Sequence, residues 1–340
     1  MTLTRALASV VILTACSITL SLAVSSPAFQ RNSTPWIDPG EGLVLMWVSA
    51  VNSNGNSMPD LMRSNFHVWE DDREQKIEYF APNSEPISVG IIRGGGDNTD
   101  TAITFLRTTS WSEEFFEMRD QTVDPSFTTE FRHLSRMRMD CPDSKICRLI
   151  RISMDEIFIA LEYLKEAANR RKVLLLLGDS DDYDPLDPRY GNPRNPRTAQ
   201  PGLLPTYVMA RALRQDAQIY TVLTYPAVFD DITVERKKNT YDPQYSTNFF
   251  EAISRGTGGR VLGAYANSAT SMEKAAAQIA RGLETQYLIG YRSTNPVMDG
   301  KWRRIRIAVE PVTGPGPLTS WTRSGYYADK RATLKVPKEY

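Results

Sequence analysis

Cysteine and histidine are scarce in this chain, and their scarcity limits the chemistry that it can carry. Its 340 residues include 3 cysteines and 2 histidines, His67 and His133. These histidines stand in separate regions and lack the clustered partners of a zinc site. The sequence also has no Gly-x-Ser-x-Gly elbow, which would expose a nucleophilic serine. We therefore predict that the chain is not an enzyme.

An excess of charge of either sign is absent as well. Lysine plus arginine number 40, and aspartate plus glutamate number 40, so the formal net charge is zero. A balanced chain creates no overall field that would draw it to nucleic acid or to an anionic membrane. We expect no nucleic acid partner, and membrane contact only through the N-terminus.

Long hydrophobic runs are confined to the N-terminus. Arg5 precedes an apolar run over residues 6–24, which small residues follow. This is the form of a secretory signal peptide, predicted here for residues 1–28, and it predicts export to the periplasm or cell envelope, or secretion. Within the run, Leu-Thr-Ala-Cys at residues 13–16 resembles a lipobox, which leaves lipidation of Cys16 open. Retention as an uncleaved anchor also stays open.

The two remaining cysteines, Cys141 and Cys147, are close in the sequence. An exported protein meets an oxidising compartment, where such a pair is better interpreted as one local disulfide than as a metal site. A loop this small would contribute about 2 kcal/mol to stability. Two unpaired buried thiols are the alternative.

Segments near both ends of the chain show the alternation of β-strands. A polar, proline-bearing linker at residues 29–40 precedes a β segment at 41–82, and a second β segment at 286–329 precedes a tail at 330–340. We expect large aromatic side chains of these segments to fill the core of an antiparallel β unit. Three tryptophans belong to this group: Trp47, Trp69 and Trp302.

Residues 85–285 alternate strand-like and helix-like segments, which predicts an α/β fold with a doubly wound, mostly parallel sheet. Residues 173–177 are apolar on both faces, as strands buried between two layers of helices are. The strand at residues 87–92 runs directly into Arg93 and three glycines. Ligands of such sheets bind beyond the carboxyl ends of the strands. We therefore expect Arg93 at the floor of a binding crevice.

The glycines after Arg93 lack the rest of a phosphate-binding motif. No Gly-Lys-Ser/Thr follows Gly94, Gly95 and Gly96, so a nucleotide-triphosphate loop is excluded. The dinucleotide fingerprint would need a third small residue where this chain has Thr99. We interpret the glycines as a shortened loop.

Short motifs along the chain carry a resemblance to a known family. They are residues 65–72, 75–77, 87–92, 284–291, 299–305 and 323–328. These stretches resemble the motifs of the exported bacterial VWFA-related domain family, also called the VWFA-related Acidobacterial domain. The similarity covers nearly all of the chain after the leader. It implies a von Willebrand factor A fold, Rossmann-like in its sheet, with flanking β segments that pair into a small sandwich.

A von Willebrand A domain usually holds a divalent cation at a metal-ion-dependent adhesion site. Its ligands are an Asp-x-Ser-x-Ser after the first strand, a threonine, and an aspartate after the fourth strand. In this chain Arg93 replaces the first aspartate, Gly95 and Asp97 replace the serines, and Arg151 replaces the threonine. Only Asp179 matches. The resemblance therefore implies a degenerate site, and we expect no metal and no other cofactor.

We hypothesise that the guanidinium of Arg93 takes the place of the metal. The first and fourth strands are neighbours in this fold, so Arg93 and Asp179 are expected side by side. A guanidinium can bridge a carboxylate through two hydrogen bonds. The alternative is an Arg93 that points into solvent without a partner.

The acidic loop after the fourth strand leaves a second interpretation open. Asp179, Asp181 and Asp182 crowd this loop with Asp184, and Asp97 could lie opposite. Such oxygens could bind a divalent cation, Ca²⁺ more readily than Mg²⁺. The favoured interpretation of the loop is a solvated acidic segment that pairs with the nearby arginines Arg189, Arg194 and Arg197. The whole loop at residues 182–205 is long enough to be either functional or disordered.

We therefore predict an exported, non-enzymatic module of von Willebrand A type that binds another protein or scaffolds the envelope. Two alternatives remain. One is a cation-dependent adhesion module that uses the loop from Asp179 to Asp184, and the other is a hydrolase with a catalytic carboxylate in that loop. The binding crevice is predicted to contain Arg93, Gly94, Gly95, Asp97, Arg151, Asp179, Asp181 and Asp182.

Overall fold

Three β-sheets organise the part of the chain that the computed structural model describes. The chain divides into Met1–Asp38 and Pro39–Tyr340, and every described residue lies in the second of these units. The described residues are 43–82, 85–94, 99–109, 112–118, 127–130, 152, 154–169, 171–178, 205–225, 243–265, 269–310 and 318–328.

The central sheet is parallel and has the strand order β6-β5-β7-β8-β9. One antiparallel bridge, between Phe115 and Thr128, extends it beyond β6. This architecture confirms the predicted α/β class and the mostly parallel sheet. The strands are β5 (Ile87–Arg93), β6 (Ser112–Met118), β7 (Arg171–Gly178), β8 (Ala217–Tyr225) and β9 (Val261–Tyr265).

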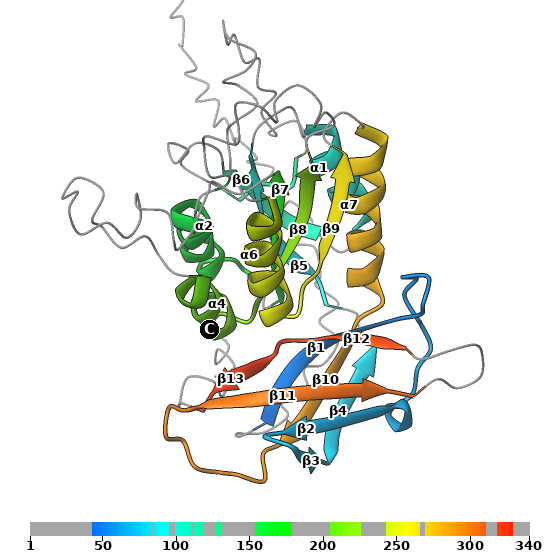
Figure 1. Ribbon diagram of the computed structural model, residues 1–340, viewed down its shortest axis with the longest axis vertical. Helices are drawn as coiled ribbons and strands as arrows, with labels where there is room; N and C mark the ends of the chain where they lie inside the picture. The colour runs from blue at the N-terminus through cyan, green and yellow to red at the C-terminus, as the bar shows by residue number, and fades with distance from the viewer. Residues whose placement is uncertain are drawn as a thin grey trace, which may run out of the picture. The chain divides into compact units, whose positions relative to one another are not determined.

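Helices cover both faces of the parallel sheet, as Figure 1 shows. One face packs against α1 (Thr99–Thr108) and α7 (Ala269–Glu284). The other packs against α2 (Met154–Lys165), α4 (Pro205–Arg214) and α6 (Pro243–Gly256). Because both faces are covered, successive residues of a central strand are apolar, which explains the run of leucines in β7.

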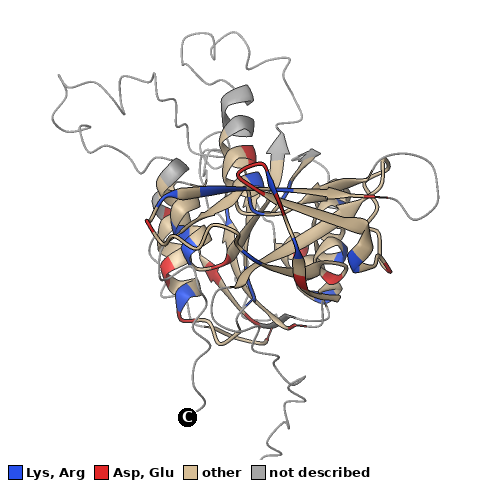
Figure 2. Cartoon of the chain, turned by 90° about the horizontal axis from the view of Figure 1, so that it is seen from below, with Lys and Arg blue, Asp and Glu red and all other residues tan. Residues whose placement is uncertain are grey.

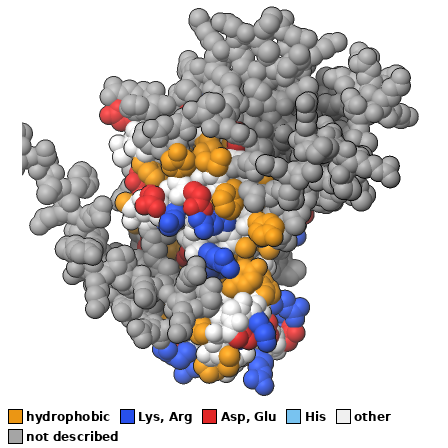
Figure 3. Space-filling model, turned by 90° about the vertical axis from the view of Figure 1, so that its left-hand side faces the viewer, with side chains coloured by type: hydrophobic (Ala, Val, Ile, Leu, Met, Phe, Trp, Pro, Cys, Tyr) orange, Lys and Arg blue, Asp and Glu red, His pale blue; other side chains and the backbone are white. Residues whose placement is uncertain are grey.

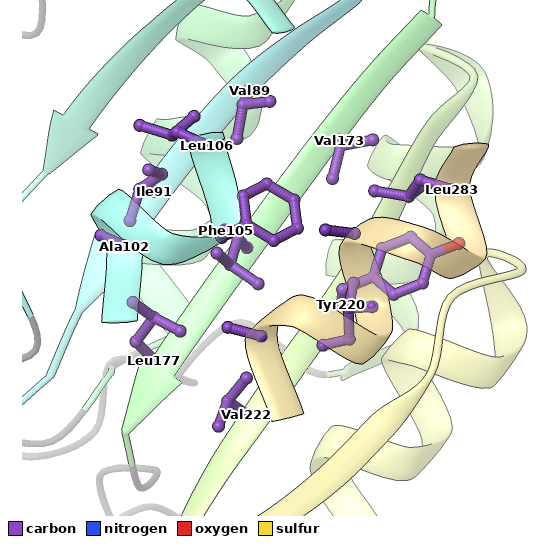
Figure 4. Packing of buried hydrophobic residues seen from close by; sticks show 14 of the residues in the cluster. Val89, Ile91, Ala102, Phe105, Leu106, Val173, Leu177, Tyr220, Val222 and Leu283 are labelled. Atoms are coloured by element: carbon purple, nitrogen blue, oxygen red, sulfur yellow. The ribbon is translucent and has the colours of Figure 1, made fainter. Parts of the chain in front are cut away.

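The core between α1, α7 and the sheet is shown in Figure 4. Phe105 of α1 is fully buried and lies in this core among aliphatic residues of β5 and β7, such as Val89 and Val173. Burying a side chain of this size stabilises the fold by roughly 1.5–3 kcal/mol. The packing therefore holds the first helix, which follows Arg93, in a fixed position on the sheet.

Two antiparallel sheets form a sandwich around one shared core. Their strand orders are β12-β1-β10-β4 and β13-β11-β2-β3. Strands from the N-terminal β segment pair with strands from the C-terminal one, β1 with β10 and β2 with β11, as expected for the accessory unit. The elements are β1 (Leu43–Val51), the 3-10 turn η1 (Arg63–Asn65), β2 (Phe66–Glu70), β3 (Arg73–Gln75), β4 (Ile77–Pro82), β10 (Tyr287–Arg292), β11 (Trp302–Val309), β12 (Thr319–Trp321) and β13 (Gly325–Tyr327).

The expectation that three tryptophans fill the sandwich core is wrong. In β2 the inward positions belong to Phe66, Val68 and Glu70, so the period of two turns Trp69 outward. The guanidinium of Arg306 covers the Trp69 ring at 3.7 Å from its centroid. Trp302 is likewise on the outward side of β11. Trp47 is buried, but it belongs to a separate cluster outside the shared core.

Charges of both signs are spread over the described elements. Figure 2 shows basic and acidic residues interspersed along the chain, and Figure 3 shows them side by side among hydrophobic side chains on one face. In the described part of the chain, no helix is long and apolar enough to cross a membrane. The predicted leader with Cys16, and the pair Cys141 and Cys147, lie outside the described residues.

Candidate functional site

The strand order of the parallel sheet reverses between β5 and β7. From β5 the chain passes through α1 to β6 on one side, and it later returns through α2 to β7 on the other side. We call the carboxyl ends of β5 and β7 the switch point. In open α/β sheets, ligands bind outside the strand ends at this position. Arg93, the last residue of β5, lies there in register with Leu177 of β7, so the expected adjacency of these two strands is confirmed.

The side chain of Arg93 is buried and points into the protein, with 0% of its side-chain surface exposed. Its Nη1 donates a hydrogen bond to Thr99 Oγ1 at 2.6 Å, and its Nε donates to Glu117 Oε1 at 2.5 Å. The Nη2 atom forms an ion pair with the same carboxylate. The alternative of an arginine that points into solvent is therefore wrong.

Three elements meet at this arginine because of the register of the sheet. β5 and β6 run parallel, with Ile91 opposite Glu117, so Glu117 lies next to the end of β5. Thr99 is the first residue of α1, which starts beside the same edge. A cation near a helix N-terminus is electrostatically unfavourable, and the carboxylate of Glu117 offsets that cost.

Two glycines bring the exits of β5 and β7 into direct contact. The backbone N–H of Gly94 donates to the carbonyl of Leu177 at 2.9 Å. Gly178 has φ +142°, and a Cβ on it would lie 3.1 Å from the Cα of Gly94. A side chain at residue 178 would therefore push the two strand ends apart. The interpretation of the three glycines as a shortened loop stays a prediction, because Gly95 and Gly96 lie outside the described residues.

The structure describes only part of the predicted crevice. Arg93 and Gly94 are described at the switch point. The bridge from Arg93 to Asp179 and the acidic-loop cation site stay predictions, since their partners are not described. The predicted site residues outside the described ranges are Gly95, Asp97, Arg151, Asp179, Asp181 and Asp182.

The described residues of the switch point do not fit a divalent cation. Thr99 Oγ1 and Glu117 Oε1 are oxygens of the type that Mg²⁺ and Ca²⁺ use as ligands. Both accept hydrogen bonds from the guanidinium of Arg93. To bind there, a metal ion would have to displace the guanidinium of Arg93 from Thr99 Oγ1 and Glu117 Oε1.

The histidine in the described part of the chain, His67, lies in the sandwich and not at the switch point. Its Nδ1 is 2.9 Å from Glu74 Oε1, and its Nε2 is 3.5 Å from Glu310 Oε1. All three side chains are substantially exposed. His133 lies outside the described residues.

Sequence reasoning missed Glu117 and Thr99 as partners of Arg93. Glu117 is one of three glutamates in β6, and no spacing distinguishes it from the other two. The register between two parallel strands that are joined by a helix is set by packing, and a single sequence does not state it. Thr99 stands out in the sequence only as a position in a glycine motif. Threonine is nevertheless preferred at helix starts, and a helix that follows a strand of a parallel sheet begins at the edge of that sheet. This pattern could have placed the Thr99 side chain near Arg93.

A buried polar network lies at the opposite end of β7 and joins the parallel sheet to the sandwich. Arg171 is 1% exposed, and its Nη2 donates to Gln286 Oε1 at 2.5 Å. Gln286 Nε2 donates to Ser49 Oγ and to the hydroxyl of Tyr220, both at 2.9 Å. The guanidinium also stacks over the Trp47 ring at 4.7 Å. Burial lowers the pKa of Arg171 to about 10 and raises the pKa of Tyr220.

A second buried network centres on Glu70 inside the sandwich. The hydroxyls of Tyr291 and Tyr326 each donate to Glu70 Oε2 at 2.8 Å, and Ser293 Oγ donates to Oε1 at 2.5 Å. Burial, together with the carboxylate, raises the pKa of both tyrosines. Three of the stretches that carry the family resemblance, at residues 65–72, 284–291 and 323–328, meet at this carboxylate. Those stretches, which are far apart in the sequence, therefore lie together inside the sandwich.

Comparisons with known proteins give little further information. No protein-family model and no curated protein sequence matches the chain. Among solved structures, the human COPII-coat protein Sec24c is similar with a TM-score of 0.30 and 10% identity, over 73% of this chain and 44% of that chain. A mutant of the PilB minor pilin from Streptococcus sanguinis has a TM-score of 0.29 and 9% identity, over 59% of this chain and 62% of that one. The chain thus spans less than two thirds of either structure, and likenesses this weak carry no argument.

Proposed function

We propose that the chain is an exported, non-enzymatic module of von Willebrand A type that binds another protein or scaffolds the envelope without a metal ion. The observation that carries the metal-free part of this proposal is the buried arginine at the switch point. Arg93 places a permanent positive charge there and is bonded to Thr99 and Glu117. The protein-binding part rests on the resemblance to the VWFA-related domain family.

In this proposal Arg93 supplies locally the positive charge that a cation would supply in a complete adhesion site. A metal at such a site keeps an open position for an acidic group of the partner. The guanidinium here is desolvated and its described donors are directed at internal acceptors. Partner recognition would then depend on the shape of the surrounding loops and not on one coordinated carboxylate.

The localisation in this proposal follows from the N-terminal sequence. The signal-peptide pattern at residues 1–28 supports export to the periplasm, the cell envelope or the medium. Cleavage, lipidation at Cys16 and retention as an anchor would each present the folded part of the chain outside the cytoplasm.

A capture experiment tests the proposed function. The full chain, immobilised without metal, is incubated with an envelope extract from its own source in the presence and absence of EDTA. The proposal expects one or more proteins to be captured equally in both conditions. A matched immobilised chain with the change Asp100→Asn, at the exposed acidic residue of α1, controls for unspecific charge attraction. Capture that EDTA abolishes, and that added Mg²⁺ or Ca²⁺ restores, would contradict the metal-free proposal.

A further inference from the structure

Arg260 is a half-buried arginine whose charge no described carboxylate balances. It precedes β9, and the described residues include no acidic side chain within ion-pair distance of it. Burial lowers its pKa, and the neighbouring phenol of Tyr220 acts in the opposite direction. A desolvated cation without a nearby anion is costly, and such a group is normally paired. Its position therefore calls for an explanation.

A second arginine and a tryptophan stand beside Arg260. The Cζ atom of Arg260 lies 5.4 Å from the centroid of the Trp321 ring, and that of Arg255 lies 5.1 Å from the same centroid. The indole Nε1 of Trp321 is buried and has no hydrogen-bond partner among the described residues. We call these three residues the Trp321 cluster. It brings two guanidinium groups together around one ring.

The position of Arg255 has an ordinary explanation, whereas that of Arg260 does not. Arg255 belongs to the last turn of α6, where a cation interacts favourably with the helix dipole. Its ion pair with Glu251, at 3.6 Å, is largely exposed. Such a pair contributes little, so most of the charge of Arg255 remains available to another anion.

The backbone between the two arginines is fixed. Thr257 Oγ1 accepts from the backbone N–H of Ile219 at 3.0 Å, and the carbonyl of Arg260 accepts from Thr221 at 3.0 Å. Gly258 has φ +87°, and a Cβ on Gly259 would lie 1.8 Å from the carbonyl oxygen of Ile219. This turn therefore has one tight path, and donors held in advance lose less entropy when a ligand binds.

We propose that the Trp321 cluster is a docking site for carboxylate groups of an acidic segment in a protein partner. The proposal rests on the proposed function in one respect, namely that the partner is a protein. A carboxylate matches the planar fork of a guanidinium, and the Trp321 cluster holds two such groups. The chain has no net charge, and the described side chains on the face in Figure 3 mix both signs, which favours a short acidic segment over a long polyanion as the ligand.

Titration calorimetry with a capped hexaglutamate peptide tests this site on the full chain. We expect saturable binding that weakens as NaCl is added, because the contact is between charges. Arg260→Gln should weaken it by about tenfold or more, the usual effect of losing a charge-assisted hydrogen bond. Arg255→Gln changes an exposed side chain, so it preserves the fold, and it should also weaken binding.

The matched control is Arg306→Gln. Arg306 also stacks on a tryptophan, but on a different one, Trp69, and it occupies an exposed, outward position of β11. This variant should bind hexaglutamate like the wild type. Equal weakening by Arg306→Gln and Arg255→Gln would show unspecific charge attraction and overturn the proposal, as would a wild type that does not bind. If Arg260→Gln lowers only the melting temperature, and Arg255→Gln leaves binding unchanged, the cluster is a structural stack and the proposal fails.

The same variants separate this site from the proposed function. An envelope extract that yields no captured protein would contradict the proposed function, while the hexaglutamate titration would still decide the site. A wild-type chain that captures a protein, together with an Arg255→Gln chain that captures it equally well, would place recognition elsewhere and overturn the docking site alone.

Discussion

At the scale of single residues, the arrangement around Arg93 depends on charge compensation. A buried guanidinium is stable only when acceptors surround it, and here a carboxylate from β6 and a hydroxyl from α1 fill that role. The pair is therefore coupled: neither Arg93 nor Glu117 can be changed alone without leaving a charge buried.

Replacing Arg93 with methionine tests that coupling. The variant Arg93→Met keeps most of the side chain's volume but leaves the carboxylate of Glu117 without the guanidinium. We expect the free energy of unfolding to fall by about 3–5 kcal/mol, the usual cost of breaking a buried pair from one side. Urea unfolding followed by far-UV circular dichroism measures the change.

The double variant Arg93→Met/Glu117→Gln serves as the control. It removes both charges, so it should be more stable than the single variant. A single variant that lies within about 1 kcal/mol of the wild type would indicate a solvated surface arginine. That result would contradict the buried pair.

Glu70 offers a residue-scale prediction that depends on pH. Tyr291→Phe removes one of three hydroxyls that donate to this buried carboxylate. We expect a loss of about 1–3 kcal/mol near neutral pH. Burial and the carboxylate raise the pKa of Tyr291 above its ordinary value. The stabilising effect of its phenol is therefore complete below the unfolded-state pKa of about 10, and is lost as the pH rises through the folded-state value.

The measurement is urea unfolding of the wild type and Tyr291→Phe at a series of pH values. The difference in their free energies of unfolding should shrink as the pH rises above about 10. Tyr207→Phe, at a tyrosine with 60% exposure, is the control and should change stability little at any pH. A difference for Tyr291→Phe that stays constant across the alkaline range would refute the assignment of a raised pKa.

At the scale of elements, the switch point depends on the close approach of β5 and β7. Gly178→Ala would introduce both a strained φ and a contact with the backbone of Gly94. Gly300 has φ +73° as well, but nothing lies within 4 Å of a Cβ there. Gly300→Ala therefore reports the backbone strain alone.

We expect Gly178→Ala to destabilise the fold by at least about 1 kcal/mol more than Gly300→Ala does. Thermal unfolding of the two variants in one buffer measures the difference. If Gly178→Ala were no worse than Gly300→Ala, the strand ends would have room to separate, and the described contact would not be a constraint.

The sequence predicts the elements well wherever burial fixes the pattern. Residues 87–92 and 173–177 are mostly apolar and are buried on both faces, and both are central parallel strands. Prediction fails where the phase of alternation matters. Trp69 looks like a core residue by type, but Phe66 and Val68 occupy the inward phase of β2. Within the predicted β segment at 286–329, residues 319–327 form two short strands, β12 and β13, which belong to different sheets.

The candidate site could be predicted only in part, and for a physical reason. The position of Arg93 follows from the local sequence, because an apolar strand followed by glycines indicates the carboxyl-terminal edge of a parallel sheet. Its partners follow from tertiary packing, since Glu117 is brought beside β5 by the register of two strands that α1 separates in the chain. Three of the stretches that carry the family resemblance are informative about the sandwich, because they meet at Glu70.

At the scale of the whole molecule, the network around Gln286 couples the parallel sheet to the sandwich. Gln286→Ala would leave Arg171, Ser49 and Tyr220 without a shared partner. We expect a loss of about 1–3 kcal/mol. We also expect the wild type to unfold in one transition, since the network and the buried Arg171 tie the two parts together.

Calorimetric unfolding of the wild type, Gln286→Ala and Gln278→Ala examines this coupling. Gln278 donates a partly buried hydrogen bond to the carbonyl of Gly55 at 3.2 Å, so its variant is the matched control and should stay close to wild type. Two separate transitions already present in the wild type would disprove coupling of the sheets.

The central claim is that a buried arginine stands at the switch point in place of a cation. Isothermal titration of the full chain with Mg²⁺, Mn²⁺ and Ca²⁺ tests it most directly, with Asp179→Ala and the exposed-helix control Asp100→Ala titrated beside the wild type. We predict no saturable heat of binding for any of the three ions in any of the three chains. Saturable micromolar binding that Asp179→Ala abolishes and Asp100→Ala leaves intact would contradict the claim.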